Sequence, residues 1–505
     1  MGAGRNMSSS HVGPSKAYGT LLNRGFYSSR RSFIEKVIKE VESTVSKGQG
    51  LILVAPTGIG KTAVPLAFAV ASQLGYEEVL GVAHVMPLKA LIDDVGRRIC
   101  EGLSKLGVPE DACIVAKQYS MSHQSPFYAA PYVATTADMY FLSIAKIPVE
   151  EIGKIVSSDR EYELFGHYEL PRGALLSYLN VLDEAHLIIE GHEKGMRAIA
   201  AVLKFLAEVG TPFVLMTATL PDKIVSNLVR IAGQGRVKLV KYSPNIDDEF
   251  YKVEVCKKFE LVNDGLLNIE EDADILEMIN EFSGRKAIVV NTVERAVRIY
   301  EKLGRKALLL HSRFTIRDRE EKLEVLSKTD IVITTQVIEA GVDVSFDVLI
   351  SELAPISNLV QRFGRLARGD ENLEGVWGVF YDVNSLEGSG IYDRDFIEQT
   401  FHILSSCNRS KIHWHLLMLK ELHGYEELIN SVWSRIYHPL HSVEVELMKI
   451  FRNPLVSSKD VIKYLMYIGN FLREDNYLPI YLGEPPSEYA KYLENVETQL
   501  VPTSS

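Results

Sequence analysis

A glycine-rich octapeptide, Ala55-Pro-Thr-Gly-Ile-Gly-Lys-Thr62, follows an apolar run and opens a helical pattern. A strand, a loop of this spacing and a helix, in that order, predict a phosphate-binding loop. Glycine tolerates the backbone angles that turn N–H groups inward, and the helix N-terminus adds positive potential. Lys61 is then expected to reach the β- and γ-phosphates of ATP, while the Thr62 hydroxyl ligates Mg²⁺. The expected nucleotide contacts of the loop are Thr57, Gly58, Gly60, Lys61 and Thr62.

Short apolar runs alternate with helical patterns in two series along the chain, which predicts an α/β fold of two tandem RecA-like lobes, each a doubly wound parallel sheet. The first series comprises Leu51–Ala55, Val79–Val85, Asn180–Asp183 and Phe213–Thr217. The second comprises Lys286–Val290, Ala307–Leu310, Asp330–Thr335, Val348–Leu353 and Trp377–Tyr381. We expect a flexible leader at 1–24, lobe 1 at 25–240, lobe 2 at 250–387 and a mostly helical accessory domain at 388–505.

Composition narrows the class of protein only moderately. The chain of 505 residues has a net charge of −11, which does not exclude nucleic acid because a local basic groove can bind phosphates on an acidic protein. Neither a signal peptide nor a long uncharged apolar run is visible, so we expect a cytoplasmic protein that does not enter a membrane. The four cysteines form no Cys-x-x-Cys pair, and we expect them to be reduced.

Candidate catalytic residues follow two strands of the first series. Asp183 is expected to hold Mg²⁺, and Glu184 to orient and deprotonate the attacking water. The next strand ends in Thr217-Ala218-Thr219. The hydroxyls of Thr217 and Thr219, with His186, are candidates for coupling the acidic turn to a nucleic-acid site, although a helix cap would also explain the threonines.

The sequence of lobe 2 contains no second phosphate loop, but it contains arginines that are candidate contacts to the γ-phosphate. In Gln361-Arg-Phe-Gly-Arg365-Leu-Ala-Arg368, a helix would place Arg365 and Arg368 on one face. Two guanidinium groups directed across a cleft would stabilise γ-phosphate transfer, and Gln361 would contact the phosphates or the catalytic water. Asp343 is a candidate contact to the ribose or to a cleft arginine.

Polar side chains at other strand ends suggest a track for a nucleic-acid strand. Hydroxyls, helix N-termini and single basic groups there could hold a sugar-phosphate backbone without reading bases, although each alone could be a cap or turn. The candidates are Lys89, Thr135, Thr136, Ser312, Arg313, Thr335 and Gln336. Upstream of the phosphate loop, nucleotide contacts by Tyr27, Arg30 and Arg31 remain an open alternative.

In this order, the motifs resemble superfamily 2 helicases of the DExH type over residues 25–385. A narrower resemblance rests on Gln336-Val-Ile-Glu339 and on Glu352-Leu-Ala-Pro355 before the arginine motif. Both are similar to the CRISPR-associated helicases of type I interference systems. That resemblance implies 3′→5′ translocation on single-stranded DNA, driven by ATP and Mg²⁺, after recruitment by an RNA-guided surveillance complex.

Fused members of that family carry an HD-type metal nuclease. The residues before Ala55 are too few for such a domain, and no His-Asp dipeptide occurs in the chain. The resemblance therefore implies a helicase subunit that acts with a separate HD-type nuclease. Two alternatives remain: a general DExH DNA-repair or RNA helicase, and a nucleic-acid clamp that uses ATP only as a switch. Glu184 and the two arginines argue against a clamp, because binding alone requires neither.

Overall fold

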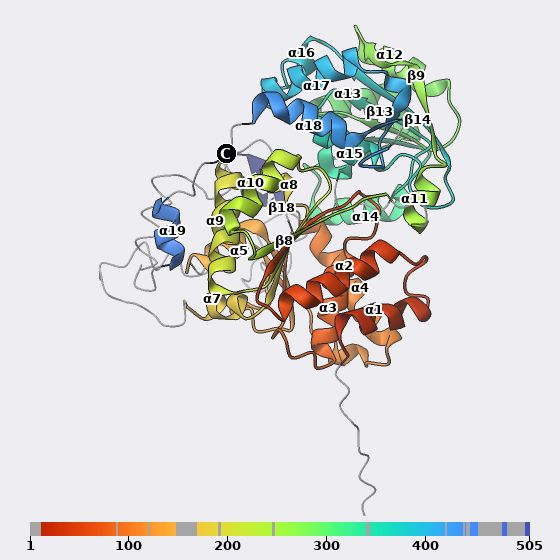
Figure 1. Ribbon diagram of the computed structural model, residues 1–505. Coiled ribbons are helices and arrows are strands. Elements are labelled where there is room, and N and C mark those ends of the chain that lie inside the picture. Colours follow the sequence, from red (N-terminus) through yellow and green to blue (C-terminus); the bar gives the residue numbers. More distant parts are fainter. Residues whose placement is uncertain are drawn as a thin grey trace, which may run out of the picture.

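The computed structural model describes residues 12–86, 89–119, 122–147, 169–189, 193–244, 248–339, 344–419, 422–437, 440, 445–452, 477–481 and 500–504. Two parallel-sheet lobes lie one above the other in Figure 1, with lobe 1 in red to yellow and lobe 2 in green to blue. Both lobes have the α/β architecture that the alternating pattern predicts. Among the described residues, no helix is long and apolar enough to cross a membrane.

The sheet of lobe 1 has the strand order β4-β3-β5-β2-β6-β7-β1-β8 and is parallel except between β3 and β4. Its strands are β1 (Gly50–Val54), β2 (Val82–Met86), β3 (Ala116–Tyr119), β4 (Ser122–His123), β5 (Tyr132–Thr136), β6 (Leu179–Leu182), β7 (Phe213–Thr217) and β8 (Val237–Lys241). The accompanying helices are α1 (Pro14–Asn23), α2 (Ser32–Val45), α3 (Ala63–Gln73), α4 (Lys89–Lys105), α5 (Ala137–Ile144), α7 (Glu169–Leu176), α8 (His186–Ile189), α9 (Glu193–Val209) and α10 (Asp222–Ala232).

Lobe 2 has the strand order β11-β12-β10-β13-β14-β9, and all its pairings are parallel. Its strands are β9 (Lys258–Asn268), β10 (Lys286–Val289), β11 (Leu308–Leu310), β12 (Ile331–Thr334), β13 (Val348–Glu352) and β14 (Glu374–Tyr381). Its helices are α11 (Glu249–Glu254), α12 (Asp272–Asn280), α13 (Val293–Leu303), α14 (Ile316–Leu326), α15 (Ile356–Phe363) and α16 (Val383–Leu386).

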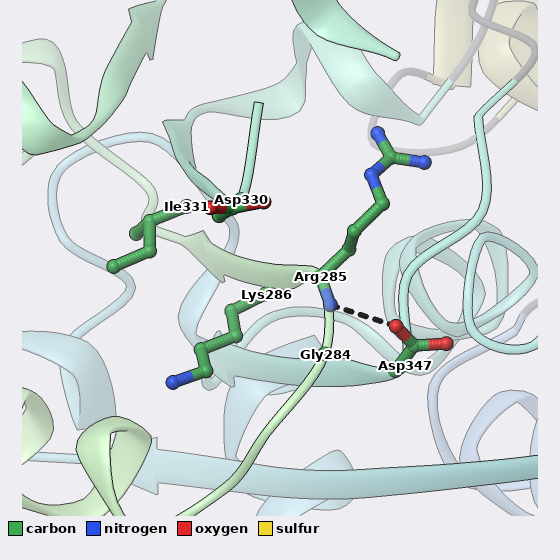
Figure 2. Close-up of a pocket in the computed structure, with 6 residues that line it drawn as sticks. All are labelled: Gly284, Arg285, Lys286, Asp330, Ile331 and Asp347. Carbon is green, nitrogen blue, oxygen red and sulfur yellow. Dashed lines mark hydrogen bonds between the residues drawn. The ribbon is translucent and has the colours of Figure 1, made fainter. Parts of the chain in front are cut away.

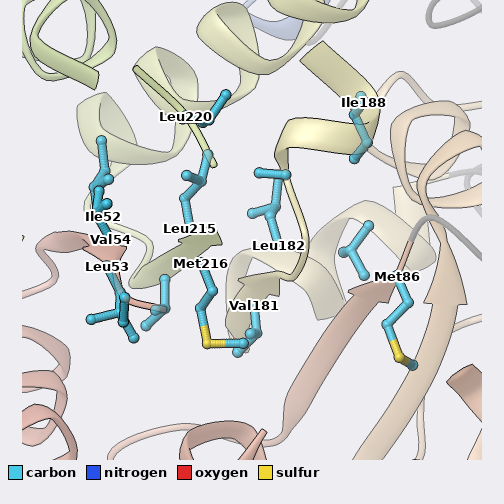
Figure 3. Close-up of a cluster of buried hydrophobic side chains, with 14 of the residues drawn as sticks. Ile52, Leu53, Val54, Met86, Val181, Leu182, Ile188, Leu215, Met216 and Leu220 are labelled. Atoms are coloured by element: carbon cyan, nitrogen blue, oxygen red, sulfur yellow. The ribbon is translucent and has the colours of Figure 1, made fainter. Parts of the chain in front are cut away.

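Central strands are apolar along their whole length because helices cover both faces of each sheet. Every residue of β1, Gly50-Leu-Ile-Leu-Val54, is buried. Figure 3 shows its side chains beside those of β6 and β7, including Leu182 and Leu215. This packing holds the carboxyl ends of β1, β6 and β7 together, and these ends carry the phosphate loop, the acidic pair and the two threonines.

The residues after 388 include helices that contact both lobes. They form α17 (Arg394–Ser406), α18 (Tyr425–Ile436), α19 (Val445–Arg452), the short strands β15 (Ile412–His413) and β16 (His423–Gly424), and the hairpin of β17 (Tyr477–Tyr481) and β18 (Leu500–Ser504). In Figure 1, α18 lies beside α15 and α17 on lobe 2, whereas α19 packs against α9 of lobe 1.

Two expectations about the first lobe need correction. The segment expected to be a flexible leader contains α1, whose Ala17 and Leu21 are fully buried against α2 and α3. Cys100 and Cys113 form a disulfide, with their Cα atoms 5.5 Å apart, whereas Cys256 and Cys407 are free. The prediction of reduced cysteines is wrong for the first pair, because the chain after α4 folds back against that helix.

Candidate ATP site between the lobes

A cavity of about 860 Å³ lies between the lobes at the carboxyl ends of the lobe 1 strands. It is lined by almost all the residues predicted for nucleotide chemistry: Thr57, Gly58, Gly60, Lys61, Thr62, Asp183, Glu184, Gln361, Arg365 and Arg368. Asp343 falls outside the described residues. The fold therefore gathers motifs that are more than 300 positions apart in the chain into one site.

The phosphate loop has the conformation that its sequence requires. Gly58 and Gly60 have φ angles of +79° and +100°, a region that favours glycine. Lys61 is buried, and its Nζ donates hydrogen bonds to the carbonyl oxygens of Ala55 (3.3 Å) and Pro56 (3.2 Å). The ammonium group is thus held inside the loop, where a bound phosphate would compete for it.

Asp183 is held by the buried pair of His84 and Tyr132, which sequence analysis did not identify as site residues. Its Oδ1 accepts a hydrogen bond from the Glu184 amide (2.9 Å), and its Oδ2 lies 3.2 Å from His84 Nε2. His84 Nδ1 in turn lies 2.8 Å from the Tyr132 hydroxyl oxygen. Burial raises the pKa of Asp183, but the hydrogen bond from His84 and the charge of Lys61 outweigh it, so the pKa lies below its usual value. The carboxylate is therefore fixed in its charged form.

Glu184 has the chemistry expected of a general base. Its φ angle is +46°, an unusual conformation for a residue other than glycine. Among the described residues, its buried Oε2 has no hydrogen-bond partner. Burial and the charge of Asp183 raise the pKa of Glu184, although Lys61 and Arg368 oppose this shift. A desolvated carboxylate with a raised pKa can accept a proton from water.

Oxygen atoms suited to Mg²⁺ are present beside the phosphate loop. Thr62, the residue before α3, and Asp183 both line the cavity. Hydroxyl and carboxylate oxygens are the ligand types that Mg²⁺ prefers, usually together with phosphate oxygens and water. These residues fit the ion that their motifs predicted.

A direct hydrogen bond joins the two lobes at the catalytic turn. Gln361 Nε2, on α15, lies 3.3 Å from His186 Nε2, and His186 Nδ1 lies 3.5 Å from Glu184 Oε2. Burial lowers the pKa of His186 to about 3, so the ring is neutral and its Nε2 can accept from the amide. In this arrangement Gln361 contacts the acidic turn through His186.

The two arginines do not share a helical face, which corrects the geometry predicted for them. Helix α15 ends at Phe363, so Arg365 and Arg368 lie in the turn beyond it. Arg365 donates from Nε and Nη2 to the carbonyl oxygens of Ile338 (3.0 Å) and Glu339 (2.9 Å). Arg368 lies close enough to Glu184 to oppose the rise in its pKa. In this structure Arg365 is tied to its own lobe, while Arg368 lines the same cavity as Glu184.

Arg362 makes a buried hydrogen-bond network next to the turn that carries Arg365 and Arg368, a role not predicted from the sequence. It is fully buried, and its guanidinium donates to Glu339 Oε1 (2.8 Å), Ser351 Oγ (2.9 Å) and Asn291 Oδ1 (3.1 Å). Burial raises the pKa of Glu339 despite the charge of Arg362. The pair links the segment after β12 to α15.

The threonines after β7 do not bond to the acidic turn through their hydroxyls. Thr217 Oγ1 accepts from the Thr219 amide (3.3 Å), and Thr219 Oγ1 is buried with no described partner. The connection between the two segments is instead made by backbone atoms, because the Ala185 amide donates to the Met216 carbonyl oxygen (3.1 Å).

Thr135 and Thr335, two residues predicted for the nucleic-acid track, are buried, which corrects their assignment, whereas Gln336 is partly exposed. Thr135 is fully buried and hydrogen-bonded to the Tyr128 hydroxyl (3.0 Å), and Thr335 is 2% exposed. Gln336 Nε2 donates to the Asn291 carbonyl oxygen (2.9 Å) within lobe 2. These strand ends are covered by neighbouring elements, so hydroxyl and amide groups there stabilise the lobe.

The remaining track residues stay candidates. Thr136 is partly exposed at the start of α5, and Ser312 and Arg313 are exposed after β11. Arg313 pairs with Glu294 at 2.5 Å. Lys89 begins α4, but its side chain falls outside the described residues.

Aromatic and basic residues form another part of the cavity wall. Tyr27 and Arg31 line it, and the Arg31 guanidinium lies 5.5 Å from the centre of the Phe250 ring. Arg31 also pairs with Asp370 of lobe 2 at 2.9 Å. Arg30 instead pairs with Glu35 in solvent, so the structure separates these neighbouring arginines. A flat cation and aromatic rings are suited to a nucleobase.

A second hollow, shown in Figure 2, lies at the opposite end of the lobe 2 sheet, where β10 and β12 begin. Arg285 and Asp347 already have partners there: the Arg285 amide donates to Asp347 Oδ2 (2.7 Å), and the Arg285 guanidinium donates to the Ser345 and Leu326 carbonyl oxygens. Catalytic motifs are absent from its lining residues. The interlobe cavity is therefore the candidate active site.

The paired lobes and the motifs that face each other across the cavity define a class, the two-lobed helicases of superfamily 2. Residues 35–228 match the family of DEAD/DEAH box helicases. Residues 283–371 match the C-terminal part of the CRISPR-associated nuclease/helicase Cas3. The chain thus carries a DEAD/DEAH helicase domain and a Cas3-type C-terminal helicase domain, which confirms the resemblance to CRISPR-associated helicases.

Individual relatives point the same way. The chain is 29% identical over 391 residues to the CRISPR-associated helicase Cas3 of Thermoproteus tenax, an alignment that covers 74% of this chain and 62% of that protein. Its fold is similar to that of T. fusca Cas3 with ADP, at a TM-score of 0.66 and 17% identity, covering 98% of this chain and 65% of that one. A chain of the pre-nicking CRISPR RNA-guided surveillance complex gives a TM-score of 0.60 at 18% identity, covering 94% of this chain and 63% of that one. The chain thus spans less than two thirds of each of these relatives.

Proposed function

We propose that the protein is an ATP-dependent motor that translocates 3′→5′ on single-stranded DNA in type I CRISPR interference. The observation that carries this proposal is the interlobe cavity, where a phosphate loop and an acidic pair face the arginine turn. A nucleotide in this cavity would touch both lobes. Hydrolysis would remove the group that joins them and let the lobes separate.

Each group in the cavity has a defined task in this proposal. Lys61 leaves the carbonyl oxygens of its own loop to bind the β- and γ-phosphates. Glu184 takes a proton from the attacking water, and Arg368 stabilises charge on the transferred phosphoryl group. Mg²⁺, when bound by Thr62 and Asp183, neutralises phosphate charge.

The substrate and partners follow from the resemblance. One relative is a chain of an RNA-guided surveillance complex, so we propose that such a complex loads this chain onto the displaced DNA strand in the cytoplasm. A separate HD-type nuclease would then cut the DNA. Exposed groups such as Thr136, Ser312 and Arg313 would hold the strand by its backbone.

The test combines hydrolysis and unwinding. ATP turnover is measured with single-stranded DNA, with single-stranded RNA and without nucleic acid, alongside unwinding of duplexes with 3′ or 5′ tails. We expect stimulation by DNA and unwinding of the 3′-tailed duplex, both abolished in Lys61→Ala. Stimulation by RNA alone would indicate an RNA helicase, and binding of ATP and DNA without turnover would indicate a clamp.

A further inference from the structure

The arginine turn, residues 364–368, follows α15 and has an uncommon backbone conformation. Ala367, between the two arginines, has a φ angle of +45°, which residues other than glycine rarely adopt. Lobe 2 supplies some of the contacts that hold it: the Ala367 amide donates to the Phe346 carbonyl oxygen (2.8 Å), and the Arg368 amide donates to Ser345 Oγ (2.8 Å). Such a conformation persists only where the surrounding structure fixes it, so each contact to this turn helps to decide where its guanidinium groups point.

A further contact to the turn comes from His415, in the C-terminal region. The Phe363 carbonyl oxygen, at the end of α15, accepts from the Leu366 amide within the turn (3.0 Å) and lies 3.1 Å from His415 Nε2. A carbonyl oxygen can only accept, so Nε2 is the donor. His415 is buried and lines the interlobe cavity together with Arg365 and Arg368. The imidazole thus holds the backbone from which both arginines extend.

The other ring nitrogen of His415 is fixed by a carboxylate of α11. His415 Nδ1 lies 2.6 Å from Glu254 Oε2, and Glu254 Oε1 accepts from Lys257 Nζ (2.7 Å). Burial raises the pKa of Glu254, but His415 and Lys257 outweigh it and bring the pKa to about 2, so the carboxylate is charged and accepts. Both partners of the ring are therefore acceptors, which requires hydrogen on both nitrogens. His415 bridges α11 and the arginine turn, with a charge-assisted bond at the α11 end.

Helix α11 extends this bridge to lobe 1. It is the first helix after β8, the last strand of the lobe 1 sheet in chain order. At its start, Glu249 Oε2 accepts a hydrogen bond from the hydroxyl of Ser32 (3.1 Å), the first residue of α2. Phe250, the next residue of α11, packs edge-to-face on Tyr242 and lines the cavity. Direct contacts therefore run without a break from lobe 1 through α11 and His415 to the arginine turn.

We propose that His415 is a positioning residue of the ATP site, whose bond to the Phe363 carbonyl oxygen holds the arginine turn so that Arg368 points at the γ-phosphate of bound nucleotide. Glu254 aims the ring at that oxygen. His415 belongs to none of the helicase motifs recognised in the sequence, so hydrolysis depends on the C-terminal region as well as on the two lobes. This inference rests on the ATPase activity proposed above.

Two amide variants separate the two bonds of His415. In His415→Asn the amide nitrogen takes the place of Nδ1 and can still donate to Glu254, but it does not reach Phe363. In His415→Gln the amide nitrogen takes the place of Nε2 and keeps a donor for the Phe363 carbonyl oxygen. A misplacement of about 1 Å can lower a rate about 10²-fold, so kcat for ATP in His415→Asn should fall roughly 10- to 100-fold with little change in KM. His415→Gln should retain most of the activity.

The background of Arg368→Ala shows whether His415 acts through the arginine turn. If it does, His415→Asn should lower kcat little further once Arg368 has been removed. A role in stability alone would lower kcat by the same factor in both backgrounds. His415→Phe keeps a ring of similar size but has no donor, so it should show the same losses and replaces His415→Asn if the smaller side chain prevents folding.

The matched control is His423→Asn. His423 makes the same kind of pair, with Nδ1 2.9 Å from Glu427 Oε2, but it is not among the residues that line the cavity, so kcat should not change. An unchanged kcat in His415→Asn, an equal loss in His415→Gln, or equal factors in the two Arg368 backgrounds would overturn the inference. An unmodified chain no more active than Lys61→Ala would instead overturn the proposed function.

Discussion

Replacing Arg362 by methionine would test how much the buried ion pair of lobe 2 contributes to stability. The guanidinium is fully buried and also donates to the Glu352 carbonyl oxygen (3.1 Å) and the Tyr392 hydroxyl (2.9 Å), besides its bond to Glu339. Methionine fills much of the same space but removes the cation paired with Glu339, which then keeps only the hydrogen bond from Asn358 Nδ2 to its Oε2 (2.8 Å).

The expected loss follows from the unpaired charge. Removing one partner of a buried ion pair destabilises a protein by about 3–5 kcal/mol. At roughly 2–4 °C per kcal/mol for a domain of this size, the lobe 2 transition should fall by about 6–20 °C. The assay is thermal unfolding followed by calorimetry, with lobe 1 serving as an internal reference.

The control is Arg394→Met, since Arg394 forms an exposed ion pair with Glu398 at 2.9 Å. Exposed pairs contribute about 0–1 kcal/mol, so this variant should melt almost like the unmodified chain. The double variant Arg362→Met with Glu339→Leu should lose less than the sum of the two single variants, because neither charge is then left alone. Equal melting temperatures for Arg362→Met and Arg394→Met would refute the reasoning.

Further predictions concern the cavity. Glu184→Gln should bind Mg-ATP normally but hydrolyse it very slowly, since an amide cannot take a proton; a collapse of ATP affinity in a binding titration would make Glu184 a ligand instead. Arg368→Ala should lower kcat by roughly 10³ or more with little change in ATP affinity. Lysine there should restore little, because it lacks the planar guanidinium, and normal turnover by Arg368→Ala would remove it from the site. Because burial raises the pKa of Glu184, kcat should decline on acidification before the pH reaches the usual glutamate range near 4.3. A pH profile flat down to that range would contradict its role as the base. Single-strand binding should weaken steeply with salt, as measured by a salt titration, and a flat response would contradict backbone contacts.

Local sequence patterns were sufficient for the main architecture. The strand, glycine-rich loop and helix around Lys61 form as predicted, because apolar runs and glycine spacing act over a few residues. Each predicted strand overlaps an observed one and Phe213–Thr217 is identical, although β2 and β14 each begin three residues from the predicted start. The end of α15 at Phe363 could not be predicted in the same way, because Arg365 beyond it is held by the carbonyl oxygens of Ile338 and Glu339, which are distant in the chain.

Surface exposure was the least predictable property. Thr135 and Thr335 sit at strand ends, as their pattern indicated, yet neighbouring elements bury both. A motif places a residue at an edge of a sheet but carries no information about which distant segment covers that edge.

The order of motifs in the sequence established the two α/β lobes, the phosphate loop and the acidic turn, since each depends on residues that are neighbours in the chain. Tertiary packing decided which of these groups touch one another. His84 reaches Asp183, Gln361 reaches His186, and Cys100 meets Cys113 because strands, lobes and returning loops bring them together. Contacts across long separations depend on the shapes of whole packed surfaces, which short-range periodicity does not encode.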